Sequence, residues 1–298
     1  MEKIVLSASR RTDIPAFYMK DFMHGIRNGS FEVANPFNGN IRVVNACPEK
    51  VHSIVFWSKN YGPFLDGCYQ KTLTTLGYRL FFQFTLNSPS VILEPHIPPL
   101  AERLKQMKTL CDTFGTDAVN WRFDPICFFT LGSGEKTNNL LAFDQIAAEV
   151  SAMGIKSCTT SFLDHYPKII KRTDKEKGIR FIDPSETEKV NLILNLAKRL
   201  KSLNINLNLC CEKIIHDRLP LFSGVNESAC IDGKQLKKLY GNSISLKRDY
   251  GQRRKDGCGC TVSADVGSYA KQPCYHDCLY CYANPNPWLK KPQGRIAH

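Results

Sequence analysis

The sequence has no long hydrophobic run. No stretch approaches the roughly 20 consecutive apolar residues that a membrane-spanning helix needs. The N-terminus runs straight into a strand-like segment and shows no small-residue cleavage site, so we predict no secretory signal peptide. Internal repeats and low-complexity segments are missing too. We therefore expect a cytoplasmic protein without a membrane partner.

Acidic residues are much fewer than basic ones. The chain has 298 residues, with 40 Lys and Arg against 28 Asp and Glu, and a formal net charge of +12. This excess favours an anionic partner, such as a phosphorylated substrate, a nucleotide or a nucleic acid. The alternative is a solvated basic surface, because the densest runs, Lys247-Arg248 and Arg253-Arg254-Lys255, are short and carry no interleaved aromatic residues.

Thirteen cysteines are unusual in a chain without an export signal. In a small secreted protein they would indicate a disulfide framework, but cytosolic thiols stay reduced. Five of the thirteen lie between Cys258 and Cys281, whereas Cys68, Cys111 and Cys127 stand singly among apolar neighbours. We expect these three to be buried small hydrophobic residues and the clustered ones to bind metal.

Short strand-like runs alternate with longer helical stretches. Their periodicities indicate six strands with helices between them, and Ser185 is the candidate N-cap of one helix. This alternation predicts βαβ units and a parallel sheet. The predicted strands are Ile4–Ser9, Ser53–Ser58, Leu80–Leu86, Ala118–Phe123, Lys156–Phe162 and Asn204–Cys210, and the helices include Pro99–Phe114, Ala142–Met153 and Glu186–Leu203.

Polar side chains follow nearly every predicted strand. The carboxyl ends of parallel strands meet at one edge, where β/α barrels build their active sites, although polar residues also follow strands in any loop. Six strands are too few for a closed eight-stranded barrel, so we predict an α/β fold of the partial (β/α) TIM-like barrel type. By position, candidate catalytic residues are Arg10, Arg11, Asp13, Lys59, Arg122 and Asp124, and Gln83 and Thr85 are candidate cofactor contacts.

The character of the chain changes near residue 220. In the stretch that follows, glycines are frequent, hydrophobic periodicity is weak and cysteines accumulate. We therefore predict two parts: a partial barrel over residues 1–220, and an irregular cysteine-rich region over residues 221–298 that packs on the barrel mouth.

The most specific motif lies in this C-terminal region. Cys274, Cys278 and Cys281 have the spacing Cys-x3-Cys-x2-Cys, with Tyr280 directly before the last cysteine. Three close thiolates can hold three corners of a [4Fe–4S] cluster and leave the fourth iron without a protein ligand. An open coordination position is what distinguishes a catalytic metal site from a closed structural one.

This motif resembles the radical SAM signature, and its run Cys278-Leu279-Tyr280-Cys281-Tyr282-Ala283 is similar to that of the spore photoproduct lyase-related branch. Leu93-Glu94-Pro95 with Arg103-Leu104, and the run from Val55 to Asn60, resemble further segments of that branch. The resemblance implies a [4Fe–4S] cluster that chelates S-adenosylmethionine (SAM) and cleaves it to a 5′-deoxyadenosyl radical. It also implies that Glu94 and Tyr280 lie near the cofactor, and that a flavodoxin or ferredoxin donates electrons.

From Ser9-Arg10-Arg11-Thr12-Asp13-Ile14-Pro15 to Cys281-Tyr282-Ala283-Asn284, the chain resembles a family of bacterial proteins described as a conserved domain of unknown function (DUF1848). That resemblance brings no established reaction. Two features depart from the radical SAM pattern: the cysteine loop lies near the C-terminus rather than after the first strand, and there is no Gly-Gly-Glu run. A circular permutation would bring the loop to the same barrel mouth, because chain termini commonly lie close together.

A second cysteine group lies upstream of the motif. It consists of Cys258 and Cys260 between glycines, Cys230, and the pair Cys210-Cys211. Glycines let the backbone wrap closely around a metal. Cys230, Cys258, Cys260 and either Cys210 or Cys211 could form a four-thiolate site for an auxiliary Fe–S cluster or a structural zinc. Reduced thiols without a metal are the alternative.

Zinc is also the alternative at the main motif, with Cys258, Cys260 and His276 as additional ligands. Zinc sites favour two well-separated Cys-x2–4-Cys pairs, so the x3-then-x2 triplet fits a [4Fe–4S] cluster better. The predicted function is therefore that of a radical SAM-type enzyme acting on an unknown anionic substrate. The alternative function is a non-catalytic Fe–S or zinc protein that acts on nucleic acid.

Overall fold

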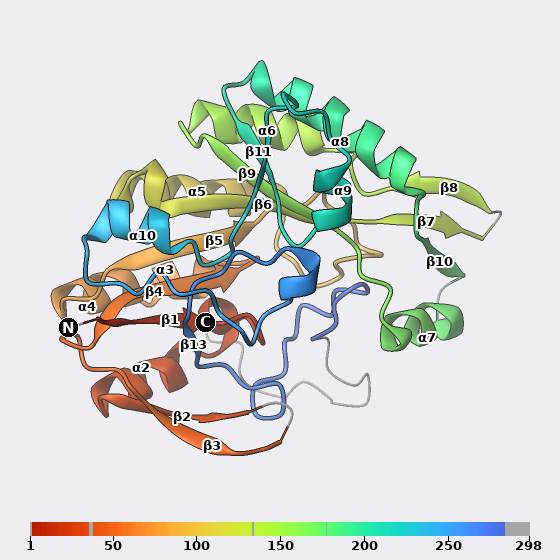
Figure 1. The fold of residues 1–298 in the computed structure, drawn as a ribbon. Coiled ribbons are helices and arrows are strands. Elements are labelled where there is room, and N and C mark those ends of the chain that lie inside the picture. Colours follow the sequence, from red (N-terminus) through yellow and green to blue (C-terminus); the bar gives the residue numbers. More distant parts are fainter. Residues whose placement is uncertain (1, 36–37, 133, 177, 284–298) are drawn as a thin grey trace.

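A computed structural model describes residues 2–35, 38–132, 134–176 and 178–283 of the chain (Figure 1). At its centre is an eight-stranded sheet with the order β12-β11-β9-β6-β5-β4-β1-β13, in which all neighbouring strands are parallel. The strands are β1 (Ile4–Ala8), β4 (Val51–Ser58), β5 (Leu80–Thr85), β6 (Val119–Ile126), β9 (Ser157–Phe162), β11 (Asn206–Leu209), β12 (Val225–Glu227) and β13 (Ala264–Asp265).

The six strands predicted from the sequence are all present in this sheet, with bounds that shift by up to a few residues. From β1 to β11 they lie side by side in their chain order. Successive βαβ crossovers of one hand produce this order. This parallel sheet with helices between its strands confirms the predicted α/β class. The described strands form an open sheet and not a closed barrel.

Helices cover one face of the sheet. α5 (Leu100–Phe114), α6 (Phe143–Ala152) and α8 (Glu186–Lys201) match the predicted helices, and α8 begins at the predicted N-cap Ser185. Bulky side chains on this face form the main core: Trp121 and Phe123 of β6 both pack against Phe143 of α6. Their burial supplies the hydrophobic stabilisation that holds the helices on the sheet.

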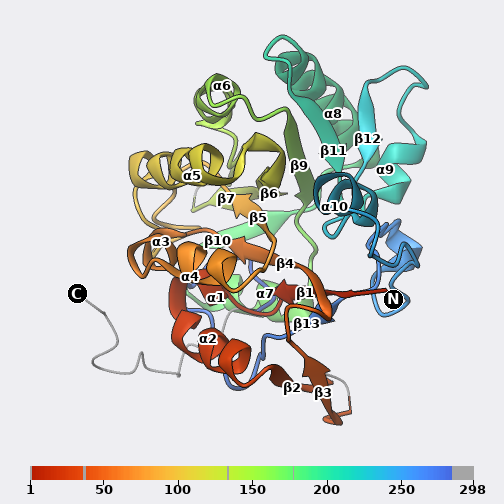
Figure 2. The ribbon, with the colours of Figure 1, turned by 90° about the vertical axis from the view of Figure 1, so that its left-hand side faces the viewer.

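Segments from the C-terminal part of the chain cover the opposite face. Ile231, Leu236 and Ile244 pack against Val5 of β1 and Val55 of β4. Leu236 belongs to α10 (Gly233–Tyr240). Figure 2 shows α10 on one side of the strands and α5 and α6 on the other. The sheet is thus enclosed between its crossover helices and the region that carries the clustered cysteines.

Two smaller sheets were not predicted from the sequence. One is the antiparallel hairpin of β2 (Ser30–Ala34) and β3 (Ile41–Asn45), in which only Val33 and Val44 are buried. With one buried residue in each strand, the hydrophobic alternation is too weak to indicate a strand. The other sheet has the order β10-β7-β8, with β7 at Phe128–Leu131, β8 at Glu135–Asn138 and β10 at Ile179–Ile182.

Short helices complete the described part of the chain, and none of its helices is long and apolar enough to cross a bilayer. Cys111 and Cys127 are buried as predicted, but Cys68 is exposed, because it lies at the turn before α4. The remaining elements are α1 (Ile14–Phe17), α2 (Met19–Arg27), α3 (Gly62–Asp66), α4 (Tyr69–Thr75), α7 (Pro167–Glu176), α9 (Lys213–Asp217) and the 3-10 turns η1 (Thr116–Ala118) and η2 (Arg254–Asp256).

Strand β13 brings the C-terminal region back to the first strand. It pairs in parallel with β1, with Ala264 opposite Leu6 and Asp265 opposite Ser7. The Asp265 carboxylate accepts hydrogen bonds from the Ser7 hydroxyl at 2.9 Å, the Ser9 hydroxyl at 2.6 Å and the Arg10 backbone N–H at 2.8 Å. The segment that follows β13 therefore starts at the edge of the sheet where β1 ends.

Candidate functional site

The three-cysteine loop lies at the carboxyl ends of β1, β4 and β5. His276 Nε2 donates a hydrogen bond to Asp13 Oδ2 at 2.8 Å, and Asp13 follows β1. The backbone N–H of Leu279 donates to the carbonyl of Leu93, which lies in the connection after β5, at 2.9 Å. Polar side chains that follow separate strands therefore meet around one loop, as predicted for the strand ends.

The Asp13 carboxylate links this loop to the sheet through hydrogen bonds to both. Its buried carboxylate accepts hydrogen bonds from the Ser58 hydroxyl at 2.7 Å and from the Lys59 N–H at 3.0 Å, both at the end of β4. It also accepts from the Ala16 N–H at 3.0 Å and so caps α1. Because His276 donates to the same carboxylate, it is held as a structural anchor in this arrangement.

A second buried carboxylate, that of Glu94, lies on the other side of the loop. Its Oε1 forms an ion pair with Lys59 Nζ at 2.9 Å and accepts from Asn87 Nδ2 at 2.9 Å and from the Tyr280 hydroxyl. Burial alone would raise the pKa of Glu94, but the Lys59 ammonium and these hydrogen bonds lower it below its usual value. Oε2 is buried and has no hydrogen-bond partner among the described residues. Glu94 is therefore an ionised acceptor with one free oxygen beside the cysteine loop.

Arg172 of α7 fixes the backbone of the loop. Its Nη1 donates to the carbonyl oxygens of Leu279 at 2.7 Å and Cys281 at 3.2 Å. One guanidinium that bridges two carbonyls limits how the loop can move. Arg172 was not predicted as a site residue, because a basic residue on a helix distant in the sequence carries no local signal of such a contact.

The three thiols of the loop lie close enough to influence one another's ionisation. Burial raises the pKa of Cys278, the nearby Lys59 ammonium lowers it, and Glu94 and the other two thiols raise it. Burial likewise raises the pKa of Cys274 and Cys281. No group of three or more His, Cys, Asp or Glu side chains in the described ranges is placed to hold a metal ion. The positive charge of Lys59 lies near Cys278, where it would stabilise a thiolate.

The second cysteine group is brought together from distant segments. Cys210 Sγ lies 3.0 Å from Cys230 Sγ and 4.0 Å from Cys211 Sγ. Hydrogen bonds between side chains join Cys230 to Cys260, Cys260 to Cys258, and Cys258 to Cys211. These five thiols form a closed ring, here called the thiol ring. The sequence suggested that only one of Cys210 and Cys211 would join the group, but both do.

Two arginines lie beside the thiol ring. Arg122 Nη1 is 3.5 Å from Cys230 Sγ, and Nη2 forms an ion pair with Asp124 at 2.7 Å. Arg10 interacts electrostatically with Cys230 and Cys260, and its Nη1 is buried without a hydrogen-bond partner in the part of the chain that the structure describes. Hydrogen bonds from neighbouring thiols and the two guanidinium charges hold the pKa of Cys230 well below its usual value.

The candidates predicted at the strand ends thus fall into two groups. Lys59, Glu94 and Asp13 contact the cysteine loop or its anchor, together with Tyr280. The second group lies beside the thiol ring and consists of Arg10, Arg122, Gln83 and Asp124. Gln83 Nε2 donates to the Cys230 carbonyl at 2.7 Å, and Asp124 forms an ion pair with Arg122. Two candidates join neither group: Arg11 donates to the carbonyls of Ala34 and Gly267, and Thr85 is the last residue of β5.

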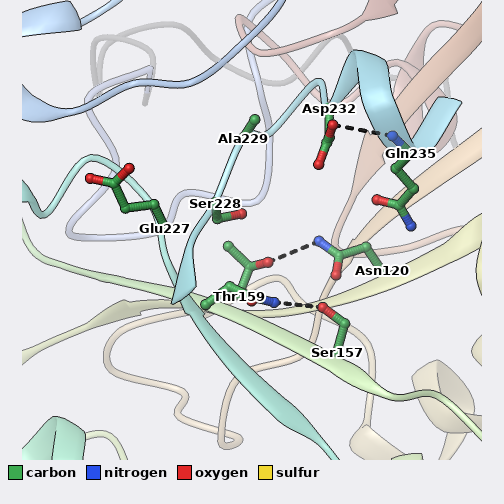
Figure 3. Close-up of a pocket in the computed structure, with 9 residues that line it drawn as sticks. Asn120, Ser157, Thr159, Glu227, Ser228, Ala229, Asp232 and Gln235 are labelled. Atoms are coloured by element: carbon green, nitrogen blue, oxygen red, sulfur yellow. Dashed lines mark hydrogen bonds between the residues drawn. The ribbon is translucent and has the colours of Figure 1, made fainter. Parts of the chain in front are cut away.

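A polar cavity of about 260 Å³ lies between the sheet and the C-terminal segments. Figure 3 shows Asn120 directed at Thr159, where Asn120 Nδ2 donates to the hydroxyl at 3.1 Å. The lining has amide, hydroxyl and carboxylate groups but no Lys or Arg, so it does not suit an anion. The lining residues are Asn120, Ser157, Thr159, Asn208, Glu227, Ser228, Ala229, Asp232 and Gln235.

Comparison with protein families matches residues 5–283 to the family described as "Domain of unknown function (DUF1848)". No curated protein matches the chain. The match spans every element of the described structure except the first residue of β1, and it includes both cysteine groups.

Proposed function

The chain belongs to the DUF1848 family, whose description assigns no activity, and we propose from its own residues that it is a radical SAM-type enzyme. In this proposal Cys274, Cys278 and Cys281 hold a [4Fe–4S] cluster that binds S-adenosylmethionine. The observation that carries the proposal is the position of the three-cysteine loop. The loop follows β13 and contacts residues at the carboxyl ends of β1, β4 and β5.

This position supports a circularly permuted arrangement of a partial barrel. β13 lies at the edge of the sheet next to β1, and the strands from β1 to β11 continue in chain order. If the chain were joined across its ends and opened before β13, the cysteine loop would follow the first strand of an ordered parallel sheet. The radical SAM resemblance of the motif calls for that order, and the C-terminal position of the loop is then no obstacle.

The residues around the loop suit a [4Fe–4S] cluster with one open iron. Three buried or half-buried thiols supply three ligands, and the Lys59 ammonium offsets part of the negative charge that their thiolates would carry. When bound, the cluster supplies the electron that cleaves S-adenosylmethionine. Arg172 holds the loop backbone at two carbonyls, which keeps the ligand spacing constant.

Glu94 is the residue best placed to bind the cofactor. Its Oε2 is ionised, buried and without a hydrogen-bond partner among the described residues, so it can accept a hydrogen bond from an ammonium or hydroxyl group. Tyr280 and Lys59 hold the other oxygen of the same carboxylate and so orient it. This arrangement supplies an acceptor for SAM in a chain that lacks a Gly-Gly-Glu run.

The basic character of the chain suits an acidic electron donor, such as flavodoxin or ferredoxin, and an anionic substrate. Arg10 and Arg11, which follow β1, are the basic residues nearest to the loop anchor Asp13 in the sequence. We place the substrate at the carboxyl ends of the strands and not in the polar cavity, because no basic residue lines that cavity.

We expect the anaerobically purified protein to contain iron and sulfide and to convert SAM to 5′-deoxyadenosine when dithionite is added. Iron and sulfide are measured by elemental and colorimetric assay, and 5′-deoxyadenosine by liquid chromatography with mass detection. Omission of dithionite is the control, since the cluster must be reduced before it can cleave SAM. Zinc in place of iron would refute the proposal, and iron without 5′-deoxyadenosine would leave a non-catalytic Fe–S protein.

Replacing Tyr280 with phenylalanine should separate catalysis from cluster binding. The ring remains packed, but the hydroxyl that contacts Glu94 and Asn87 is lost. We expect iron content to be retained and the rate of SAM cleavage to fall by about 10- to 100-fold, the usual effect of removing a partner of a metal-site group. The KM for SAM should rise, because the altered group orients the carboxylate that binds it. Tyr250→Phe, at an exposed tyrosine, is the control, and equal rates in the two variants would contradict the assignment.

A further inference from the structure

Hydrophobic packing alone does not explain why the five thiols of the ring lie together. The thiol ring joins five of the thirteen cysteines, drawn from the end of β11 (Cys210 and Cys211), the segment after β12 (Cys230) and the segment before β13 (Cys258 and Cys260). The contact of 3.0 Å between Cys210 Sγ and Cys230 Sγ is much longer than a disulfide bond of about 2.05 Å. Isolated thiols in a core behave as small hydrophobic residues and have no reason to gather.

We propose that the thiol ring binds a second iron–sulfur cluster, separate from the three-cysteine loop. Four thiolates saturate a [2Fe–2S] or [4Fe–4S] cluster, and the ring provides five. In such a cluster the cysteines bind different irons, so the ligands need not converge on one point.

The surroundings of the ring suit a group of negative charge. Arg122 Nη1 is 3.5 Å from Cys230 Sγ, and Arg10 has a buried Nη1 without a hydrogen-bond partner among the described residues. Each arginine also pairs with a carboxylate, Arg122 with Asp124 and Arg10 with Asp265, so its charge is shared. The unused donor of Arg10 is available to hydrogen-bond to an anionic acceptor.

The backbone near the ring also offers donors of the kind that hydrogen-bond to cluster sulfurs. The backbone N–H of Ile231 donates to Cys260 Sγ at 3.3 Å. Hydrogen bonds to sulfur adjust the reduction potential of such clusters. Cys230 also follows Ala229, which lines the polar cavity, and contacts Arg122 of β6.

The test compares metal content in variants that remove one cysteine group at a time. In the loop variant, Cys274→Ala, Cys278→Ala and Cys281→Ala are combined, and in the ring variant Cys230→Ser and Cys258→Ser are combined. We expect the loop variant to keep iron and sulfide at about half of the wild-type amounts if both clusters are [4Fe–4S]. Its reduced electron paramagnetic resonance spectrum should not change with SAM, because thiolates occupy every iron of the ring cluster.

The loop variant decides the question even if the ring variant does not fold, because its ring is intact. A folded loop variant without iron, or with one zinc per chain, would overturn the second cluster. The proposed radical SAM activity fails by a different result, namely a folded ring variant that lacks iron or does not cleave SAM. A Cys47→Ser/Cys68→Ser variant is the matched control, since these two thiols belong to neither group, and it should retain wild-type iron.

Discussion

The Cys278→Ala variant is expected to lose the cluster of the three-cysteine loop and all SAM cleavage. Cys278 is the middle ligand of the motif and the most buried of its three thiols. Two remaining thiolates cannot hold a [4Fe–4S] cluster of about four irons in a stable way. We therefore expect iron to fall by about four per chain and 5′-deoxyadenosine to fall below detection. Iron analysis and the dithionite assay on the same preparation measure both losses.

Cys127→Ala is the matched control for this variant. Cys127 is fully buried and belongs to the same hydrophobic cluster as Cys278, Leu279 and Tyr280, but it lies outside the motif. Both substitutions remove one sulfur atom from the same packed region, so their costs in folding stability should be similar. Only Cys278→Ala should lose iron. If both variants lost iron equally, packing and not ligation would explain the result, and the loop would no longer be the assigned site.

Asp13→Ala is expected to destabilise the fold by about 3–5 kcal/mol, since it leaves several buried donors without an acceptor. The carboxylate is buried and accepts hydrogen bonds from Ser58, the Lys59 N–H, the Ala16 N–H and His276. Loss of the α1 cap alone costs about 1 kcal/mol. Urea denaturation under reducing, anaerobic conditions measures the change in the free energy of unfolding.

The same variant should also lower the iron content, because His276 would lose its anchor and the cysteine loop would be less well positioned. Asp66→Ala removes an exposed carboxylate at the end of α3 and is the control; its effect should stay within about 0.5 kcal/mol. Asp13→Asn keeps one acceptor oxygen and should lie between the two. Equal stability of Asp13→Ala and Asp66→Ala would show that the hydrogen bonds of Asp13 do not hold the cysteine loop on the sheet.

Much of the central sheet could be predicted from the sequence because its signals are local. Runs that are mostly apolar, such as Leu80–Thr85, are typical of parallel strands buried on both faces. The capping box formed by Ser185 and Glu188 marks the start of α8. β13 has only two residues, too few to show any period. Its place beside β1 depends on Asp265 and on residues about 255 positions away, so no local pattern predicts it.

The cysteines of the proposed cluster site could be named from the sequence, but the contacts that support them could not. The spacing of Cys274, Cys278 and Cys281 is a local pattern, and its chemistry follows from the thiols themselves. The contacts of Arg172 and His276 join segments far apart in the chain, so only the fold brings them together. The sequence predicted that either Cys210 or Cys211 would join the second group, but both thiols do. A sequence does not show whether two adjacent residues after a strand can both reach the same cluster of thiols.

The position of the cysteine loop after β13 has a consequence for how the protein is made. Ribosomes release a chain from its N-terminus, and every strand of the described structure, β13 included, precedes the loop. The sheet and its crossover helices therefore leave the ribosome before the loop cysteines do, and they can fold first. If the loop binds a cluster as proposed, insertion of iron is a late step that completes an already folded protein. On that proposal, a shortage of iron would leave the protein folded but without its cluster.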